Sequence, residues 1–134
     1  MDFSSLVLME RENETGFVKK ELGSYKVSEG ALFIKKLYMI DGVVNVFFDT
    51  NKDVEEWEYS AIYDLFNVDC FKEKGYEITE ELEEYNPSFI LKFDYEDDHN
   101  VMQEKISEVV DLIDQSMNKV FKDIEGKEEE YKED

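Results

Sequence analysis

The sequence is nearly empty of the residues that most often carry catalysis or cross-link a chain. It has one cysteine (Cys70), one histidine (His99) and one arginine (Arg11). A single cysteine excludes an internal disulfide and is typical of a reducing compartment. A single arginine leaves almost none of the bidentate guanidinium forks that bind phosphate or carboxylate groups. Walker A, nucleophile-elbow and zinc-protease motifs are missing too, so the sequence disfavours the common enzyme classes and predicts no cofactor.

Proline, glycine and long apolar runs are also scarce. One proline and six glycines in 134 residues leave no room for a long linker or a low-complexity segment. No run approaches the roughly 20 apolar residues that span a bilayer, and residues 1–5 lack the basic region of a signal peptide. These absences predict a cytoplasmic protein without membrane contact. We expect a single α+β domain at residues 1–126 and a charged, disordered tail at 127–134.

Negative charge is what the chain has in excess. It carries 35 acidic and 15 basic residues, a formal net charge of −20. Such a charge repels phosphate backbones and anionic membranes, so direct nucleic-acid binding is not expected. It favours association with a basic protein. The charge is uneven, because residues 68–134 carry 22 acids and 8 bases against 13 and 7 in residues 1–67.

Hydrophobic periodicity predicts an α+β fold. Strands are expected at residues 3–12, 17–27, 32–40, 43–49, 76–79 and 89–95. Asp41-Gly42 predicts a tight hairpin, since both residues tolerate the positive φ angles of a type I′ turn. Gly23 predicts an irregularity in the second strand. A short helix is expected at 60–66, with Ser60 as its N-cap, and residues 54–59 could extend a strand or open a helix. A loop is expected after this helix, through Cys70 and Gly75.

The long helix near the end of the chain is the clearest pattern. Apolar residues recur every three or four positions over residues 99–125, as one buried helix face requires: Met102, Ile106, Val109, Ile113, Met117, Val120 and Ile124. Asp97 or Asp98 can cap its start, and Gly126 can end it. The predicted architecture is an antiparallel sheet of about six strands, beginning as a meander, with this helix packed on its apolar face. Strong, barrel-like curling of the sheet is compatible with the element order.

Asp49, Asn51 and Asp53 form a candidate calcium site after the fourth predicted strand. They reproduce positions 1, 3 and 5 of an EF-hand loop. Val54, however, stands where that loop needs glycine, and Ser60 stands where it needs a bidentate glutamate. Asp and Asn are also frequent in ordinary polar turns, so a turn is the favoured interpretation.

Asp94, Asp98 and His99 form a second candidate metal site, before the long helix. Carboxylate oxygens and an imidazole nitrogen are ligands that divalent metal ions accept. Acidic residues before a helix also satisfy its free N–H groups and complement its dipole, and capping is the favoured interpretation. A divalent-metal-dependent enzyme or a calcium-binding protein is therefore an alternative function.

Glu55, Glu56, Trp57, Glu58 and Tyr59 form a candidate partner-binding patch. Aromatic side chains ringed by charge are typical of interface anchors, although aromatics at this spacing also seal core edges. Together with the net charge, the patch favours a non-enzymatic binding or regulatory module for a basic protein partner. A further alternative is a homodimer that pairs through its long helix or its sheet edges.

Three features together resemble a known group of proteins. They are the aromatic and acidic segment 55–66, the turn Tyr85-Asn86-Pro87, and Val120-Phe121 followed by a tail rich in Glu and Lys. These features are similar to those of a group of short, acidic, uncharacterised proteins from clostridia and related Firmicutes, defined as a domain of unknown function. The resemblance covers nearly the whole chain. It implies neither an activity nor a catalytic residue.

Overall fold

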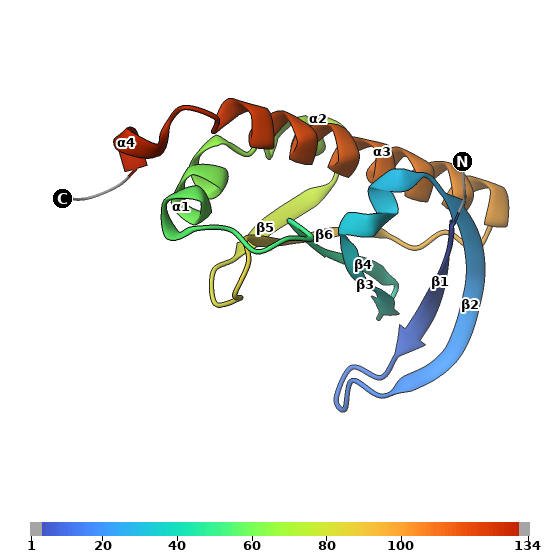
Figure 1. The fold of residues 1–134 in the computed structure, drawn as a ribbon. Coiled ribbons are helices and arrows are strands. Elements are labelled where there is room, and N and C mark those ends of the chain that lie inside the picture. Colours follow the sequence, from blue (N-terminus) through green and yellow to red (C-terminus); the bar gives the residue numbers. More distant parts are fainter. Residues whose placement is uncertain (1–3, 132–134) are drawn as a thin grey trace.

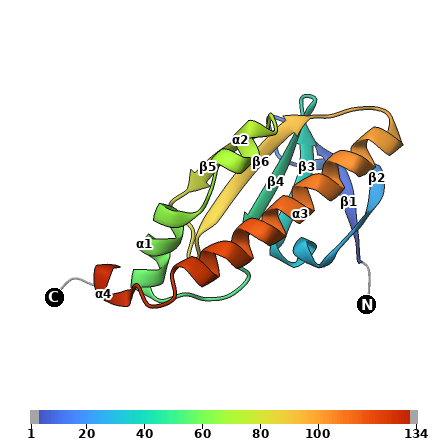
Figure 2. The ribbon, with the colours of Figure 1, turned by 90° about the horizontal axis from the view of Figure 1, so that it is seen from above.

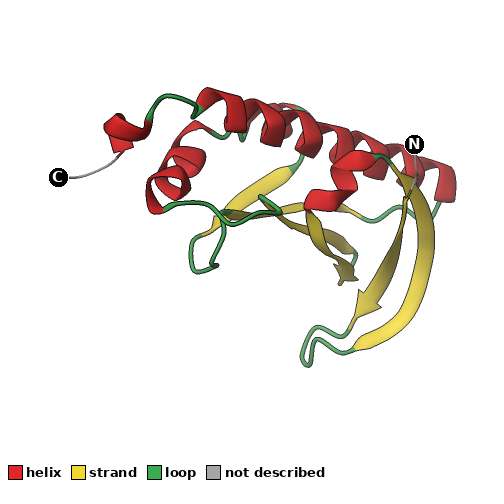
Figure 3. Ribbon diagram, viewed as in Figure 1, coloured by secondary structure: helices red, strands yellow, loops and turns green. Residues whose placement is uncertain are grey.

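The computed structural model describes residues 4–131. Its centre is a sheet of six strands with helices over one face (Figures 1 and 3), and the predicted α+β class is confirmed. The strands are β1 (Ser4–Arg11), β2 (Val18–Val27), β3 (Ile34–Ile40), β4 (Val43–Asp49), β5 (Glu77–Glu81) and β6 (Ser88–Asp94). The helices are α1 (Glu56–Leu65), α2 (Asp69–Glu73), α3 (His99–Asp123), α4 (Glu128–Tyr131) and a 3-10 helix, η1 (Glu29–Phe33).

The sheet is mixed and open. Its strand order is β2-β1-β3-β4-β6-β5, so β2 and β5 are the two edges and no barrel closes. The pairing of β1 with β3 is parallel, whereas the other pairings are antiparallel. The expected meander of the first four strands is wrong, because β1 rather than β2 lies beside β3. The reason is the connection between β2 and β3. It contains η1, which packs against α3, and it carries the chain across β1, so that β3 enters the sheet on the other side of β1.

Two local backbone predictions are confirmed. Asp41 and Gly42 have φ angles of 51° and 80°, and they join Ile40 directly to its partner Val43. In the β1–β2 pair, Leu8 faces Gly23 but Met9 faces Glu21, so the register shifts beside the glycine. Such a shift bends the strands locally, and Figure 1 shows β1 and β2 curving away from the rest of the sheet.

The core lies between α3 and the sheet. All seven residues of the predicted apolar stripe of α3 are buried. The central strands supply the opposite wall through alternating buried side chains: Val44, Val46, Phe48, Phe89, Leu91 and Phe93. Figure 2 shows α3 running diagonally across the sheet, with α1 and α2 beside it. The packing of the long helix on the sheet is therefore as predicted.

The other face of the sheet carries half-buried aromatic side chains next to cations. Within residues 4–131 no helix covers this face (Figure 1). The Arg11 guanidinium lies 4.5 Å from the centre of the Tyr38 ring, and the Lys36 ammonium lies 5.2 Å from that of Phe47. Cations beside rings screen apolar surface from water.

The helical predictions need three corrections. Of the two alternatives for residues 54–59, the helical one holds: α1 begins at Glu56, so Ser60, the expected N-cap, lies inside it and caps nothing. The loop expected through Cys70 contains α2, whose five residues are too few to show a helical period. The segment expected as a tail contains α4, from which the Tyr131 hydroxyl donates a hydrogen bond to Asp64 Oδ2 at 2.6 Å. The division of the chain at residue 126 stays a prediction.

Candidate functional site

Helix α1 begins earlier than predicted because glutamates cap it. The N-cap residue is Glu55, and Glu58 Oε1 accepts a hydrogen bond from the Glu55 backbone N–H at 2.9 Å. This is the return bond of a capping box, made with glutamate in place of the usual serine or threonine at the cap. The Trp57 indole Nε1 also donates to Glu55 Oε2, at 2.8 Å. Carboxylates that were predicted to bind a partner thus also hold the helix start.

One flank of α1 binds the turn between β5 and β6. The Tyr59 hydroxyl lies 3.0 Å from the carbonyl oxygens of both Leu82 and Glu84. The Tyr63 hydroxyl donates to the Glu81 carbonyl at 2.7 Å and accepts from the Ser88 N–H at 2.8 Å. The two tyrosine rings meet edge to face, with their centroids 5.0 Å apart. These bonds fix the turn against the helix, and they use the hydroxyl of Tyr59, which the sequence suggested as a partner anchor.

The turn itself presents exposed apolar side chains among acids. Leu82 is 64% exposed and Tyr85 is 79% exposed. We call residues 53–66 and 80–88 together the acidic end of the molecule. They contain nine acidic residues and no Lys, Arg or His. The candidate patch at Glu55–Tyr59 is therefore part of a larger surface, whose free aromatic contact is Tyr85 rather than Tyr59.

The other flank of α1 borders a cavity. It has a volume of about 320 Å³ and is lined by Trp57, Glu58, Lys52 and, from the end of α3, Phe121, Ile124, Glu125 and the following Gly126. We call it the Trp57 pocket. The Lys52 ammonium lies 4.1 Å from the centre of the Phe121 ring. Trp57 is half-buried there, so it packs against the core edge and also faces the pocket.

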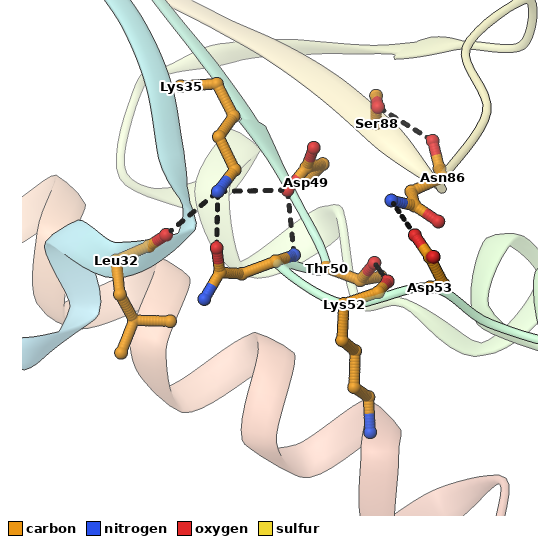
Figure 4. Close-up of polar contacts among 9 residues, drawn as sticks. Leu32, Lys35, Asp49, Thr50, Lys52, Asp53, Asn86 and Ser88 are labelled. Carbon is orange, nitrogen blue, oxygen red and sulfur yellow. Dashed lines mark hydrogen bonds and ion pairs between the residues drawn. The ribbon is translucent and has the colours of Figure 1, made fainter.

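The candidate calcium loop forms a tight turn, and the ammonium group of a lysine from β3 contacts it (Figure 4). Asp49 Oδ1 accepts from the Asn51 N–H at 2.7 Å, and the Lys35 ammonium lies 3.8 Å from the same oxygen. Lys35 also donates to Asn51 Oδ1. Asp53 points elsewhere and accepts from Asn86 Nδ2 at 3.3 Å. The structure therefore brings Asp49 and Asn51 together but directs Asp53 away from them.

The second candidate metal site is divided in a similar way. Asp98 is the N-cap of α3, and its Oδ1 accepts from the N–H groups of Asn100 and Val101 at 2.9 and 3.2 Å. The His99 ring stacks on Tyr25 with centroids 4.9 Å apart. In the part of the chain that the structure describes, no three His, Cys, Asp or Glu side chains are grouped as metal ligands. Metal binding at either segment stays a prediction.

A second cavity lies at the other end of β6. It has a volume of about 470 Å³, and its lining combines lysines and acids with Tyr76 and Phe93. Lys105 pairs with Glu96 at 3.7 Å and also lies 5.8 Å from the centre of the Phe93 ring. The Tyr76 hydroxyl donates to Glu108 Oε1 at 2.5 Å. Opposite charges are thus matched within this cavity, in contrast to the acidic end.

Sequence reasoning missed Leu82, Tyr85, Lys52 and Phe121 as site residues. The acidic residues between 77 and 84 were visible as a charged run, and 85–87 as a turn. No local pattern, however, places that turn beside Tyr59 or places residue 52 over a ring at residue 121. The one available signal was the unusual density of aromatic residues at 57–66.

The fold and site define a class: an α+β protein with a single layer of helices on an open mixed sheet and an acidic, aromatic surface at one end. The chain belongs to the Family of unknown function (DUF6762), whose family model matches residues 1–132. The resemblance to a domain of unknown function is thereby confirmed. No curated protein and no solved structure matches the chain. Among the described residues, no helix is both long and apolar enough to cross a membrane.

Proposed function

We propose that this protein is a binding module that holds a lysine-rich protein segment at its acidic end. The observation that carries the proposal is the composition of that end. Two segments, distant in sequence and joined by Tyr59 and Tyr63, contribute nine acids and no cation. On a surface that serves only for solvation, lysines or arginines would stand among the acids and balance their charge. Neither segment contains such a residue.

The rigidity of the turn supports the proposal. Contacts that are already ordered lose less conformational entropy when a partner binds. Hydrogen bonds from the two tyrosine hydroxyls hold the turn, and at its end Asn86 donates a further hydrogen bond to Asp53. Leu82 and Tyr85 can therefore meet a partner without first being ordered.

The charge supports the choice of partner. Acidic surfaces raise the rate of encounter with cationic partners and disfavour acidic ones. Exposed Leu82 and Tyr85 supply the apolar contact that charge alone lacks, since aromatic anchors dominate interface energies. We expect a partner segment in which lysines alternate with apolar residues.

The test measures the affinity of a labelled peptide with alternating Lys and Leu by fluorescence anisotropy. The control peptide has Gln at every Lys. We expect the Lys peptide to bind and the Gln peptide to bind at least about tenfold more weakly. Binding of the Lys peptide should weaken as salt screens the charges.

A matched pair of variants locates the surface. Glu83→Lys/Tyr85→Ala changes the acidic end, and Glu14→Lys/Phe17→Ala makes the same changes in the β1–β2 turn, where Phe17 is 74% exposed. The first variant should lose about tenfold or more in affinity, and the second less than about threefold. Equal losses would mean that net charge alone attracts the peptide, and the proposal would be wrong.

A further inference from the structure

The Trp57 pocket has walls suited to a cation. Trp57 and Phe121 supply aromatic rings, and Glu58 and Glu125 supply carboxylates. Ring faces carry negative electrostatic potential and attract ammonium groups. Carboxylates add charge attraction from the rim. Such a combination recognises a cation attached to an apolar stem, because the stem packs on the rings while the charge faces the acids.

The pocket already holds a cation from its own chain. The Lys52 ammonium lies 4.1 Å from the Phe121 ring centre. In Figure 4 the Lys52 side chain points away from the Asp49 and Asp53 carboxylates and toward the α3 ribbon. A lysine next to Asp53 in sequence therefore places its charge on a ring rather than on that neighbouring acid.

The Lys52 side chain can move away from the Phe121 ring. It lies in the loop between β4 and α1 and is exposed, and no ion pair within 4.0 Å holds it among the described residues. Thr50 Oγ1 donates to the Lys52 carbonyl at 2.6 Å, so the backbone at this position is fixed while the side chain is not. An external ammonium can replace the internal one without a change in the fold.

We propose that the Trp57 pocket binds the ammonium group of a lysine side chain from the partner, which displaces Lys52 from Phe121. This inference rests on the proposed function, since it names the group that the acidic end recognises on a basic segment. Trp57 and the Glu83–Tyr85 turn lie on opposite flanks of α1, so one extended segment that crosses the helix can contact both. Lys52 acts as an internal competitor that lowers the affinity for every external lysine.

The structure also provides a direct reporter. Trp57 is the only tryptophan in the chain, so fluorescence excited selectively at tryptophan, rather than at the eight tyrosines, reports on this pocket. Titration with the Lys peptide should change the Trp57 emission. The same peptide with acetylated lysines keeps the stem but loses the charge, and it should leave the emission unchanged.

Two lysine variants give the decisive comparison. Lys52→Met keeps an unbranched stem, removes the internal competitor and should tighten peptide binding about threefold to tenfold. Lys36→Met removes the same charge from the Lys36–Phe47 pair on the opposite face of the sheet, and it should tighten binding less than about twofold. Phe121→Leu should weaken binding at least about fivefold, with a thermal melt to confirm that the variant folds.

The outcomes separate this inference from the proposed function. Equal binding of the acetylated peptide, which has lost the lysine charge, overturns both the pocket and the proposed function. Equal tightening by Lys52→Met and Lys36→Met overturns the pocket alone. If the Glu83→Lys/Tyr85→Ala variant still loses affinity in that case, the proposed function stands. If no peptide binds, butylammonium is titrated against the Lys52→Met protein. If the Trp57 emission then does not change with butylammonium, that result alone overturns the pocket.

Discussion

Tyr76 shows how a single side chain can make the fold sensitive to pH. It is only 8% exposed, and its hydroxyl donates to Glu108 Oε1. Burial, with the Glu108 carboxylate as the second cause, raises the pKa of Tyr76 above its ordinary value. Burial likewise raises the pKa of Tyr63 and of Tyr25. In each case the folded state favours the protonated phenol.

We predict that the protein loses stability above about pH 10, the ordinary pKa of tyrosine. Below that value both states are protonated, and the contribution of each buried phenol is complete. Above it the unfolded state loses the proton first, so the free energy of unfolding falls until the folded pKa is reached. One unit above the ordinary pKa, a tyrosine that stays protonated in the folded state costs about 1.4 kcal/mol. Urea unfolding at about pH 8 and about pH 11 measures the loss.

Two variants assign the loss to residues. Tyr76→Phe removes one of the titrating groups and should lose about 1 kcal/mol less than the unmodified protein between the two pH values. Tyr85→Phe removes a tyrosine that is 79% exposed and should not change the loss. Identical pH dependence in Tyr76→Phe and the unmodified protein would contradict the prediction.

At the residue scale the sequence located an aromatic and acidic surface. It did not show which of the aromatic side chains are hydrogen-bonded within the protein and which are exposed. Trp57 and Tyr59 stand out in the sequence, yet Trp57 is bonded to Glu55 and Tyr59 to the β5–β6 turn. Local patterns cannot show this, because the partners of Tyr59 lie 23 and 25 positions away. Tyr85, which the sequence marked only as part of a turn, is the exposed aromatic.

Among the elements, α3 depends on one of two adjacent aspartates. The sequence allowed Asp97 or Asp98 as its cap, and the structure selects Asp98, whose Oδ1 accepts from two backbone N–H groups. Both residues are exposed, and their carboxylates differ chiefly in this role.

We predict that Asp98→Ala lowers the free energy of unfolding by about 1 kcal/mol, the usual cost of losing an N-cap. Asp97→Ala changes the net charge equally and should cost less than about 0.5 kcal/mol. Urea unfolding of the two variants measures the difference. Equal costs would mean that the two carboxylates act only through their charge near the helix start.

The element that the sequence missed most clearly is η1: no helix was predicted there, and the third strand was expected to begin at residue 32, inside it. Gly30 explains its position, because a Cβ at that residue would lie 2.5 Å from the Val110 carbonyl oxygen of α3. Only glycine allows so close an approach of η1 to the helix. The sequence contained the glycine, but it did not contain the information that α3 would lie against it.

At the scale of the whole molecule, the net charge of −20 opposes folding. Like charges repel one another more strongly in the compact state than in the unfolded chain. Salt weakens the repulsion, since the Debye length falls from about 10 Å at 0.1 M to about 3 Å at 1 M ionic strength. The same screening weakens binding of a basic peptide.

We predict that the melting temperature rises with NaCl while the affinity for the Lys peptide falls. Thermal melts and anisotropy titrations at about 0.01 M and about 0.5 M ionic strength measure the two trends. A melting temperature that falls with NaCl would contradict the prediction. Melts in MgCl₂ and CaCl₂ at equal ionic strength also test the alternative metal sites. Charge neutralisation by a divalent cation gives a small, unselective rise, so only a rise that differs between the two metals indicates specific binding.

The sequence by itself determined the elements whose information is local. The Asp41-Gly42 hairpin follows from two residues that accept positive φ, and the long helix follows from a repeat of three and four positions. Tertiary structure decided the rest: the parallel pairing of β1 with β3, the bond from Tyr59 to the turn, and the place of Lys52 on Phe121. Each of these joins segments far apart in the chain. The physical reason is that packing selects among many such pairs, and no short pattern records the choice.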